Sequence, residues 1–222
     1  GYLRGSSERI ELEAELARQM AEVIEIPCII NGEEVWTNNV VEQVMPHNHA
    51  HVLARVHLAG EKEVNDAIQA SLDAHKAWST MPWEARGAIF LKASVMLAGE
   101  RRQEINASTM LNQSKTCHQA EIDSACELID FWRFNADYAR QISADLQPPV
   151  SPSSMWNSSE VRPLEGFVFS VTPFNFSSIA ANLPSSAALM GNVGVWKPSR
   201  NSYVSNYRLM RLMMDAGLPG GV

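Results

Sequence analysis

The sequence has few cysteines, no long apolar run and no excess of positive charge. Its three cysteines, Cys28, Cys117 and Cys126, are scattered over 222 residues, which suits a reducing compartment better than a disulfide framework. No stretch approaches the ~20 consecutive apolar residues of a membrane span, and the first five residues lack the apolar core of a signal peptide. A formal net charge of -7 argues against nucleic-acid or acidic-membrane partners, which need clustered Lys and Arg. We therefore expect neither nucleic acid nor membrane as a partner.

What is present is the composition of an ordinary globular protein. Hydrophobic residues make up 45% and charged residues 19% of a chain long enough for one large or two small domains. Residues 1–146 have the pattern of helices and antiparallel strands, and residues 147–160 are a linker rich in Pro and Ser. Residues 161–222 alternate apolar runs with helical segments, as in a parallel α/β unit.

The front section predicts a hairpin among short strands. Apolar runs at 26–30 and 33–36 flank Asn31-Gly32, a pair that favours a tight hairpin turn because both turn positions need positive φ. A helix is expected before it at 7–23, and further strands at 40–44 and 52–58 give an antiparallel start.

Three or four helical segments are expected in the rest of the front section. Their ranges are 61–78, 83–98, 101–112 and 120–145. In the last of these, one apolar stripe for packing is formed by Ile122, Ala125, Ile129, Trp132 and Ala136. The carboxylates on that helix, Glu127 included, would by residue type alone be solvated.

The back section places two polar residues at one sheet edge. Strands are expected at 166–171 and 193–196, with helices at 177–190 and 203–216, and Pro184 should kink or restart the first of these helices. This order predicts a parallel, right-handed βαβα unit, in which ligands bind beyond the carboxyl ends of the strands. Asn175 and Lys197 follow consecutive strands at that edge. No G-x-G-x-x-G motif follows the first strand, so any dinucleotide is held differently from an ordinary Rossmann enzyme.

Three alternating histidines suggest metal binding as an alternative function. His47, His49 and His51 would share a face if extended and could then ligate a metal in a stand-alone metal-binding module. A solvated loop after Pro46 is the commoner outcome, and no Cys or carboxylate completes the ligand set. We therefore expect no metal.

Several motifs in one order resemble the aldehyde dehydrogenase family. They are P-F-N-F at 173–176 and W-K-P-S at 196–199, within GFVFSVTPFNFSSIAANLPSSAALMGNVGVWKPS. The stretches IPCIINGEEVWT, FLKASVML and AEIDSACELIDFWRFNADYA narrow the resemblance to the Δ1-pyrroline-5-carboxylate (glutamate-γ-semialdehyde) dehydrogenase subfamily. The resemblance implies an α/β fold, with a helical front section carrying antiparallel strands and an incomplete parallel Rossmann-like unit that starts the NAD-binding domain at residue 161.

The resemblance also implies an activity and a set of site residues. The subfamily oxidises L-glutamate γ-semialdehyde to L-glutamate with NAD in proline breakdown, through a Cys nucleophile and a Glu-activated water. By position, Asn175 corresponds to the residue that stabilises the oxyanion, and Thr172 and Lys197 to residues that bind the cofactor. Glu127 and Phe176 correspond to positions that line the aldehyde pocket. The ordinary alternatives are a helix cap for Asn175, a core residue for Phe176 and a surface charge for Glu127.

Two departures from the family qualify these expectations. None of the three cysteines matches the family's nucleophile, and that Cys and the Glu base have no counterpart up to Val222. We thus expect the N-terminal part of the enzyme, inactive by itself; the alternative is a non-catalytic truncated product that is a folded remnant or associates with full-length subunits. Arg200 replaces the usual acid that holds the ribose, so NADP is possible besides NAD.

For the complete enzyme the resemblance implies a small-molecule aldehyde substrate and a homo-oligomer. It implies the mitochondrial matrix if the source is eukaryotic, and otherwise the cytoplasm.

Overall fold

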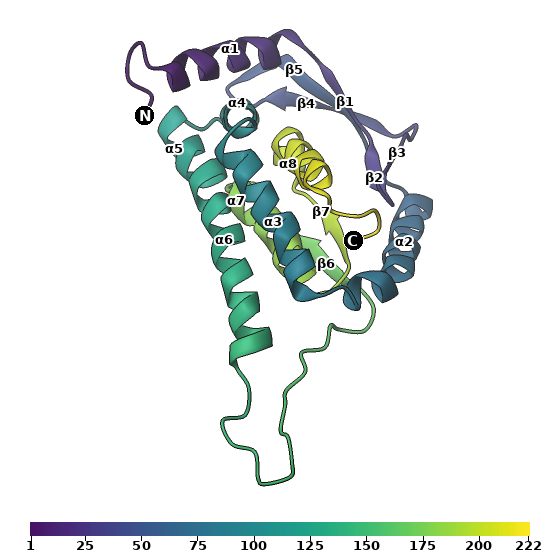
Figure 1. Cartoon of the computed structure of the whole chain (residues 1–222). Coiled ribbons are helices and arrows are strands. Elements are labelled where there is room, and N and C mark those ends of the chain that lie inside the picture. The colour runs from purple at the N-terminus through teal and green to yellow at the C-terminus, as the bar shows by residue number, and fades with distance from the viewer.

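The strands pair into three small sheets: one lies among the helices, and the other two lie at the outside of the molecule (Figure 1). The computed structural model describes all of residues 1–222. The strands are β1 (Ile24–Ile26), β2 (Cys28–Ile30), β3 (Glu33–Val35), β4 (Val40–Met45), β5 (Asn48–His57), β6 (Val168–Val171) and β7 (Gly194–Lys197). The α-helices are α1 (Ser7–Ala21), α2 (Glu61–Ser79), α3 (Trp83–Ala98), α4 (Arg102–Gln113), α5 (Cys117–Ala120), α6 (Glu127–Arg140), α7 (Ser177–Leu189) and α8 (Tyr203–Ala216). None of the helices has the length and hydropathy needed to cross a membrane.

The predicted hairpin at Asn31-Gly32 is confirmed, but the strands around it differ from the prediction. Asn31 and Gly32 have φ of 52° and 78°, as the turn requires, and β2 and β3 pair antiparallel. The expected single run at 26–30 is split at Pro27, which has no N–H to donate to a ladder. As a result β1 joins a second sheet in the order β1-β5-β4, where it lies parallel to β5, so the start is not wholly antiparallel.

The helices lie close to their expected ranges, and the longest contains two unexpected π-helical segments. Segments η1 (Glu121–Cys126) and η2 (Gln141–Asp145) flank α6, so α5, η1, α6 and η2 form one continuous helical stretch. A π-turn widens the helix and shifts the residues before it relative to those after it. Ile122 is therefore 39% exposed and does not belong to the apolar stripe, whose other four members are buried.

The βαβα unit is confirmed. β6 and β7 pair parallel, from Val168 opposite Gly194 to Val171 opposite Lys197, and α7 connects them. α7 continues through Pro184 as a single helix, so the expected restart there is wrong. Residues on both sides of Pro184, including Ala181 and Ala188, pack in the core and stabilise the helix.

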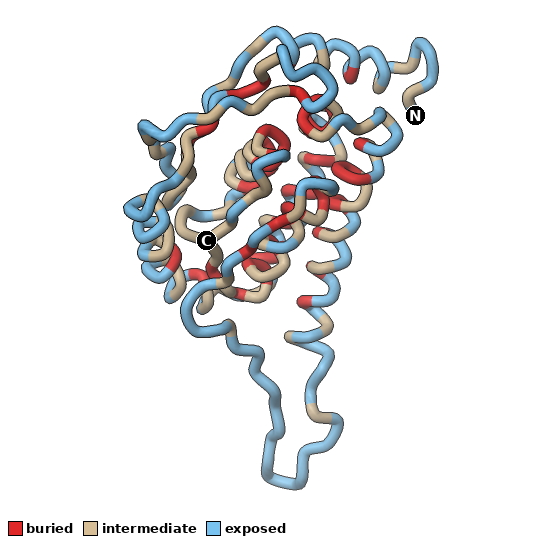
Figure 2. The backbone as a smooth tube through the Cα atoms, turned by 180° about the vertical axis from the view of Figure 1, so that it is seen from behind, coloured by how far each residue is buried: buried red, intermediate tan, exposed pale blue.

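One hydrophobic core joins the front section to the parallel unit. Its largest side chains, Trp78, Trp132 and Phe90, come from α2, α6 and α3 and pack with apolar residues of α7 and α8. The Trp78 indole N–H donates to the Ala188 carbonyl at 2.8 Å, which fixes the end of α7. Residues 147–160, the expected linker, run through a long loop that extends beyond α6 and is exposed along most of its length (Figures 1 and 2).

Candidate active site

The carboxyl ends of β6 and β7 form the edge at which the sequence predicts cofactor binding. The Thr172 backbone N–H donates to the Lys197 carbonyl at 3.3 Å, so these two residues lie side by side. Thr172 is buried, and its hydroxyl accepts a hydrogen bond from the Trp196 indole at 2.9 Å. Lys197 is exposed, and its ammonium makes no hydrogen bond or ion pair within the protein. An unpaired ammonium group therefore lies at the end of β7.

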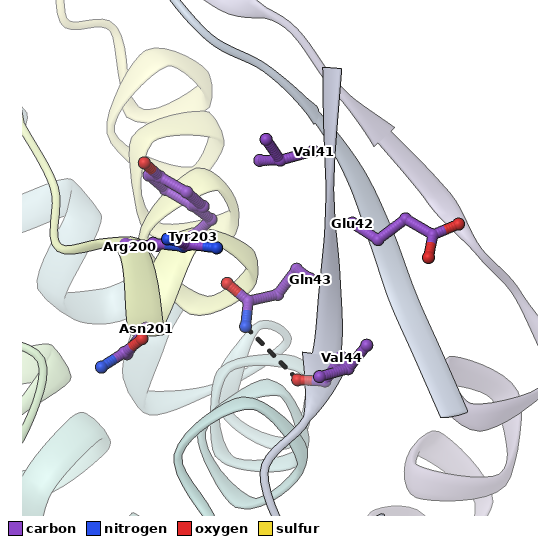
Figure 3. Close-up of a pocket in the computed structure, with 7 residues that line it drawn as sticks. All are labelled: Val41, Glu42, Gln43, Val44, Arg200, Asn201 and Tyr203. Atoms are coloured by element: carbon purple, nitrogen blue, oxygen red, sulfur yellow. Dashed lines mark hydrogen bonds between the residues drawn. The ribbon is translucent and has the colours of Figure 1, made fainter. Parts of the chain in front are cut away.

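A pocket of about 260 Å³ lies beside this edge, between β4 and the 3₁₀ turn η3 (Arg200–Ser202) (Figure 3). Arg200, Asn201 and Tyr203 line it from one side, and β4 lines it from the other with Gln43, whose amide donates to the Val44 carbonyl at 3.3 Å. Arg200 is exposed and has no carboxylate partner. Its guanidinium is therefore available to a ligand and also accessible to water.

The loop between β6 and α7 carries Asn175. Its side chain is exposed, and the amide has no hydrogen-bond partner within the protein. The N-cap of α7 is Phe176, without any side-chain cap, so Asn175 is not the helix cap that residue type alone would suggest. A neutral amide donor that is not used by its own helix is suited to bind an oxyanion.

Beneath this loop, buried hydroxyl and amide groups fix the start of α7. The Ser177 hydroxyl lies 2.9 Å from the Thr109 hydroxyl and accepts from the Gln113 amide at 2.7 Å. The same amide donates to the Ser205 hydroxyl at 2.9 Å. These contacts tie α7 to α4 and α8, so the loop that holds Asn175 ends on a rigid element.

Phe176, the N-cap of α7, and Glu127, the first residue of α6, each contact a residue that the sequence did not suggest. The Lys115 ammonium lies 4.4 Å from the centroid of the half-buried Phe176 ring and pairs with the Asp123 carboxylate of η1. Glu127 accepts a hydrogen bond from the fully buried Ser178 hydroxyl at 2.8 Å and is half-buried, so it is not the solvated charge expected from residue type. We call Phe176, Glu127, Ser178, Lys115 and Asp123 the α7 corner.

A second polar cluster anchors η1 from the opposite side. Glu121 accepts from the Tyr2 hydroxyl and the Asn106 amide, both at 2.7 Å, and pairs with Arg102. Burial alone would raise the pKa of Glu121, but hydrogen bonds from Arg102, Tyr2 and Asn106 hold it below its usual value. Burial, together with the hydrogen bond to Glu121, raises the pKa of Tyr2 to about 12. Glu121 is therefore ionised at neutral pH, and Tyr2 stays protonated as its donor.

The cysteines and histidines form no further site. All three cysteines are free and half-buried, and burial raises the pKa of each thiol, which disfavours the nucleophilic thiolate. His49 and His51 lie on β5 and not in the expected loop, whereas His47, in the turn before it, is 2.8 Å from the Ser114 hydroxyl. No three His, Cys, Asp or Glu side chains are grouped as metal ligands, so the geometry gives the alternative metal site no support.

Comparison with known proteins bears directly on this arrangement. The model of the aldehyde dehydrogenase family matches residues 35–222. The chain belongs to the aldehyde dehydrogenase family. This confirms the resemblance expressed by the P-F-N-F and W-K-P-S motifs.

The relatives of this aldehyde dehydrogenase chain include pyrroline-5-carboxylate dehydrogenases. Over the whole chain it is 48% identical to the Δ1-pyrroline-5-carboxylate dehydrogenase of Agaricus bisporus and 46% identical to the mitochondrial human protein of that name. A crystal structure of the Mycobacterium tuberculosis enzyme bound with NAD matches all of the chain at a TM-score of 0.97 and 44% identity. The chain spans 40% of the fungal protein, 39% of the human one and 41% of the mycobacterial chain.

Proposed function

We propose that the protein carrying this chain oxidises L-glutamate γ-semialdehyde, formed from Δ1-pyrroline-5-carboxylate, to L-glutamate in proline catabolism. The observation that carries the proposal is the exposed, unpaired Asn175 amide, which lies along the chain between the carboxyl end of β6 and Phe176 of the α7 corner. An amide at this point donates to the oxygen of an aldehyde as it becomes an oxyanion, and its donor capacity does not change with pH. The names of the relatives give the proposal its substrate.

The α7 corner has chemistry that suits this substrate. L-glutamate γ-semialdehyde carries an α-ammonium and an α-carboxylate group, a short apolar chain and an aldehyde. The Glu127 carboxylate, oriented by Ser178, can bind the ammonium group, and the Phe176 ring can contact the chain. With Asn175 on the aldehyde oxygen, these residues would bind the two ends and the chain of the substrate.

NAD is the proposed cofactor, with NADP possible. The edge formed by the carboxyl ends of β6 and β7 suits a nicotinamide dinucleotide. The unpaired Lys197 ammonium can donate to ribose hydroxyls, and Thr172 can contact the cofactor at the end of β6. When bound, NAD would take up the hydride that leaves the aldehyde carbon. The hydrogen bond from the Thr172 N–H to the Lys197 carbonyl holds the two residues side by side at this edge.

We further propose a homo-oligomer for the complete enzyme. For a eukaryotic source we propose the mitochondrial matrix, which is supported by relatives described as mitochondrial, and otherwise the cytoplasm.

The test uses protein expressed from the complete reading frame. NADH formation is followed with L-glutamate γ-semialdehyde, for the wild type and for Asn175→Ala. Loss of one oxyanion donor should lower kcat on the order of 10²–10³-fold, while the KM for NAD stays unchanged. Asn157→Ala, which removes an exposed amide in the long loop, is the control and should behave as wild type. Wild-type protein that forms no NADH with this substrate would refute the proposed function; an unchanged kcat in Asn175→Ala, with chemistry rate-limiting, would remove Asn175 from it.

A further inference from the structure

Lys115 stands at a point where the backbone has little freedom. Ser114 ends α4 in the left-handed conformation, with φ 56° and ψ 38°, and Thr116 begins α5 with a capping box to Gln119. His47, from the turn between β4 and β5, also contacts the Ser114 hydroxyl at 2.8 Å. Lys115 is thus the single residue between a helix C-cap and a helix N-cap, and its side chain starts from a fixed position.

The Lys115 side chain is largely shielded from water, and its charge is paired. It is 14% exposed and its partner Asp123 is 12% exposed. Burying an ammonium group is costly unless the charge is paired, and here the charge has two partners, the Asp123 carboxylate and the face of the Phe176 ring. Asp123 lies on η1, one turn before Glu127, so the pair connects the π-helical segment to the start of α7.

We propose that Lys115, oriented by Asp123, is a positioning residue that holds the Phe176 ring and, through it, the adjacent Asn175 amide. The inference rests on the proposed function in its choice of substrate. No side-chain hydrogen bond caps α7 at Phe176. The contact with the Lys115 ammonium is therefore the polar interaction that holds the Phe176 ring in position. Aromatic rings attract a desolvated cation strongly enough to change an equilibrium by about tenfold or more.

The competing explanation is that Lys115–Asp123 is only a stabilising ion pair. The same π-helical segment contains such a pair, Arg102–Glu121, whose side chains are 24% and 22% exposed and which has no contact with Phe176. It offers a matched control. If ion pairing at η1 were all that matters, Arg102→Met and Lys115→Met would have the same effect on the reaction.

The first experiment separates these explanations by steady-state kinetics of the enzyme made from the complete reading frame. Lys115→Met should lower kcat/KM for L-glutamate γ-semialdehyde on the order of 10-fold or more, with the KM for NAD unchanged. Lys115→Arg, which can still pair with Asp123 and stack on the ring, should restore most of it. Arg102→Met should lower the melting temperature without changing either constant. Equal kinetic effects of Lys115→Met and Arg102→Met, or no recovery in Lys115→Arg, would overturn the inference.

The second experiment does not depend on turnover. 4-Fluorophenylalanine is incorporated into the same protein in place of phenylalanine, and the Phe176 ¹⁹F resonance is assigned from its absence in Phe176→Leu. The resonance should move in Lys115→Met and return toward its wild-type position in Lys115→Arg. Should Lys115→Met not fold, Asp123→Asn tests the same contact, because a released ammonium would also shift the resonance. An unmoved resonance refutes the positioning role even if the enzyme is active, whereas inactive wild-type protein with a moved resonance refutes the proposed substrate alone.

Discussion

Glu121→Gln should destabilise the protein strongly at neutral pH and weakly in acid. Glu121 is the first residue of η1, and its carboxylate accepts from Tyr2, Asn106 and Arg102. Glutamine has the same shape but keeps only one acceptor oxygen, and it leaves the partly buried Arg102 guanidinium without a counter-charge. Each hydrogen bond to a charged group contributes about 1.5–3 kcal/mol. Because the Glu121 side chain is 22% exposed and partly screened, we expect a net loss of about 2–3 kcal/mol.

The pH dependence follows from the direction of the pKa shift. The pKa of Glu121 is lower in the folded protein than its usual value, so the carboxylate contributes stability above its unfolded pKa. That contribution is lost as the pH falls through the folded pKa, where the folded state must take up the proton. Glutamine does not titrate, so the stability difference between wild type and Glu121→Gln should shrink in acid.

Differential scanning calorimetry at pH 7 and pH 3.5 measures both effects. A loss of 2–3 kcal/mol corresponds to a fall in the melting temperature of roughly 4–12 °C at pH 7 for a domain of this size. Glu13→Gln is the control: Glu13 forms an exposed i,i+4 pair with Arg9 and should change stability by no more than about 0.5 kcal/mol. A deficit of the same size at both pH values, or one no larger than that of Glu13→Gln, would refute the reasoning.

Two further predictions concern the core and the cofactor. Trp78→Phe removes the hydrogen-bond donor to the Ala188 carbonyl and leaves a space in the core, so it should lower the free energy of unfolding by about 2–4 kcal/mol in chemical denaturation. The control Trp36→Phe, at a site that is 52% exposed, should lower it by only about 0.5 kcal/mol. Arg200→Asp should raise the KM for NADP relative to that for NAD, because a guanidinium can bind a 2′-phosphate and a carboxylate repels one. A constant KM ratio would mean that Arg200 only faces water.

The local structure could be predicted from the sequence where short-range chemistry decides it. The Asn31-Gly32 turn and the end of α8 at Gly217, which has φ 113°, follow from residues that favour positive φ. The parallel pairing of β6 and β7 follows from the strand–helix–strand order. The pairing of β1 with β5 could not be predicted, because it depends on how a strand of three residues packs across the whole front section.

The same distinction separates the two parts of the site. Lys197 and Asn175 were suggested by their position after apolar runs, since the end of a parallel strand is a place that the sequence reveals. Lys115 and Ser178 were not suggested, because a lysine between two helices and a serine within one are usually solvated or structural. Their contacts, Phe176 for Lys115 and Glu127 for Ser178, lie 61 and 51 residues away along the chain.

The π-helical segment explains why helical periodicity did not reveal this corner. An α-helix rotates about 100° per residue, so a widened turn between Cys117 and Glu127 displaces every earlier residue relative to the stripe that follows. Ile122 consequently turns outward while Asp123 becomes buried against Lys115. The hydrophobic pattern predicts the reverse, an inward isoleucine. A site that must hold a charge in a fixed position needs a buried polar residue such as Asp123 where the periodicity predicts an apolar one. The ion pairs of Glu121 and Asp123 offset the cost of the widened turn. The mismatch between hydrophobic pattern and burial at this segment therefore becomes visible only in the structure, which is why the sequence did not suggest the α7 corner.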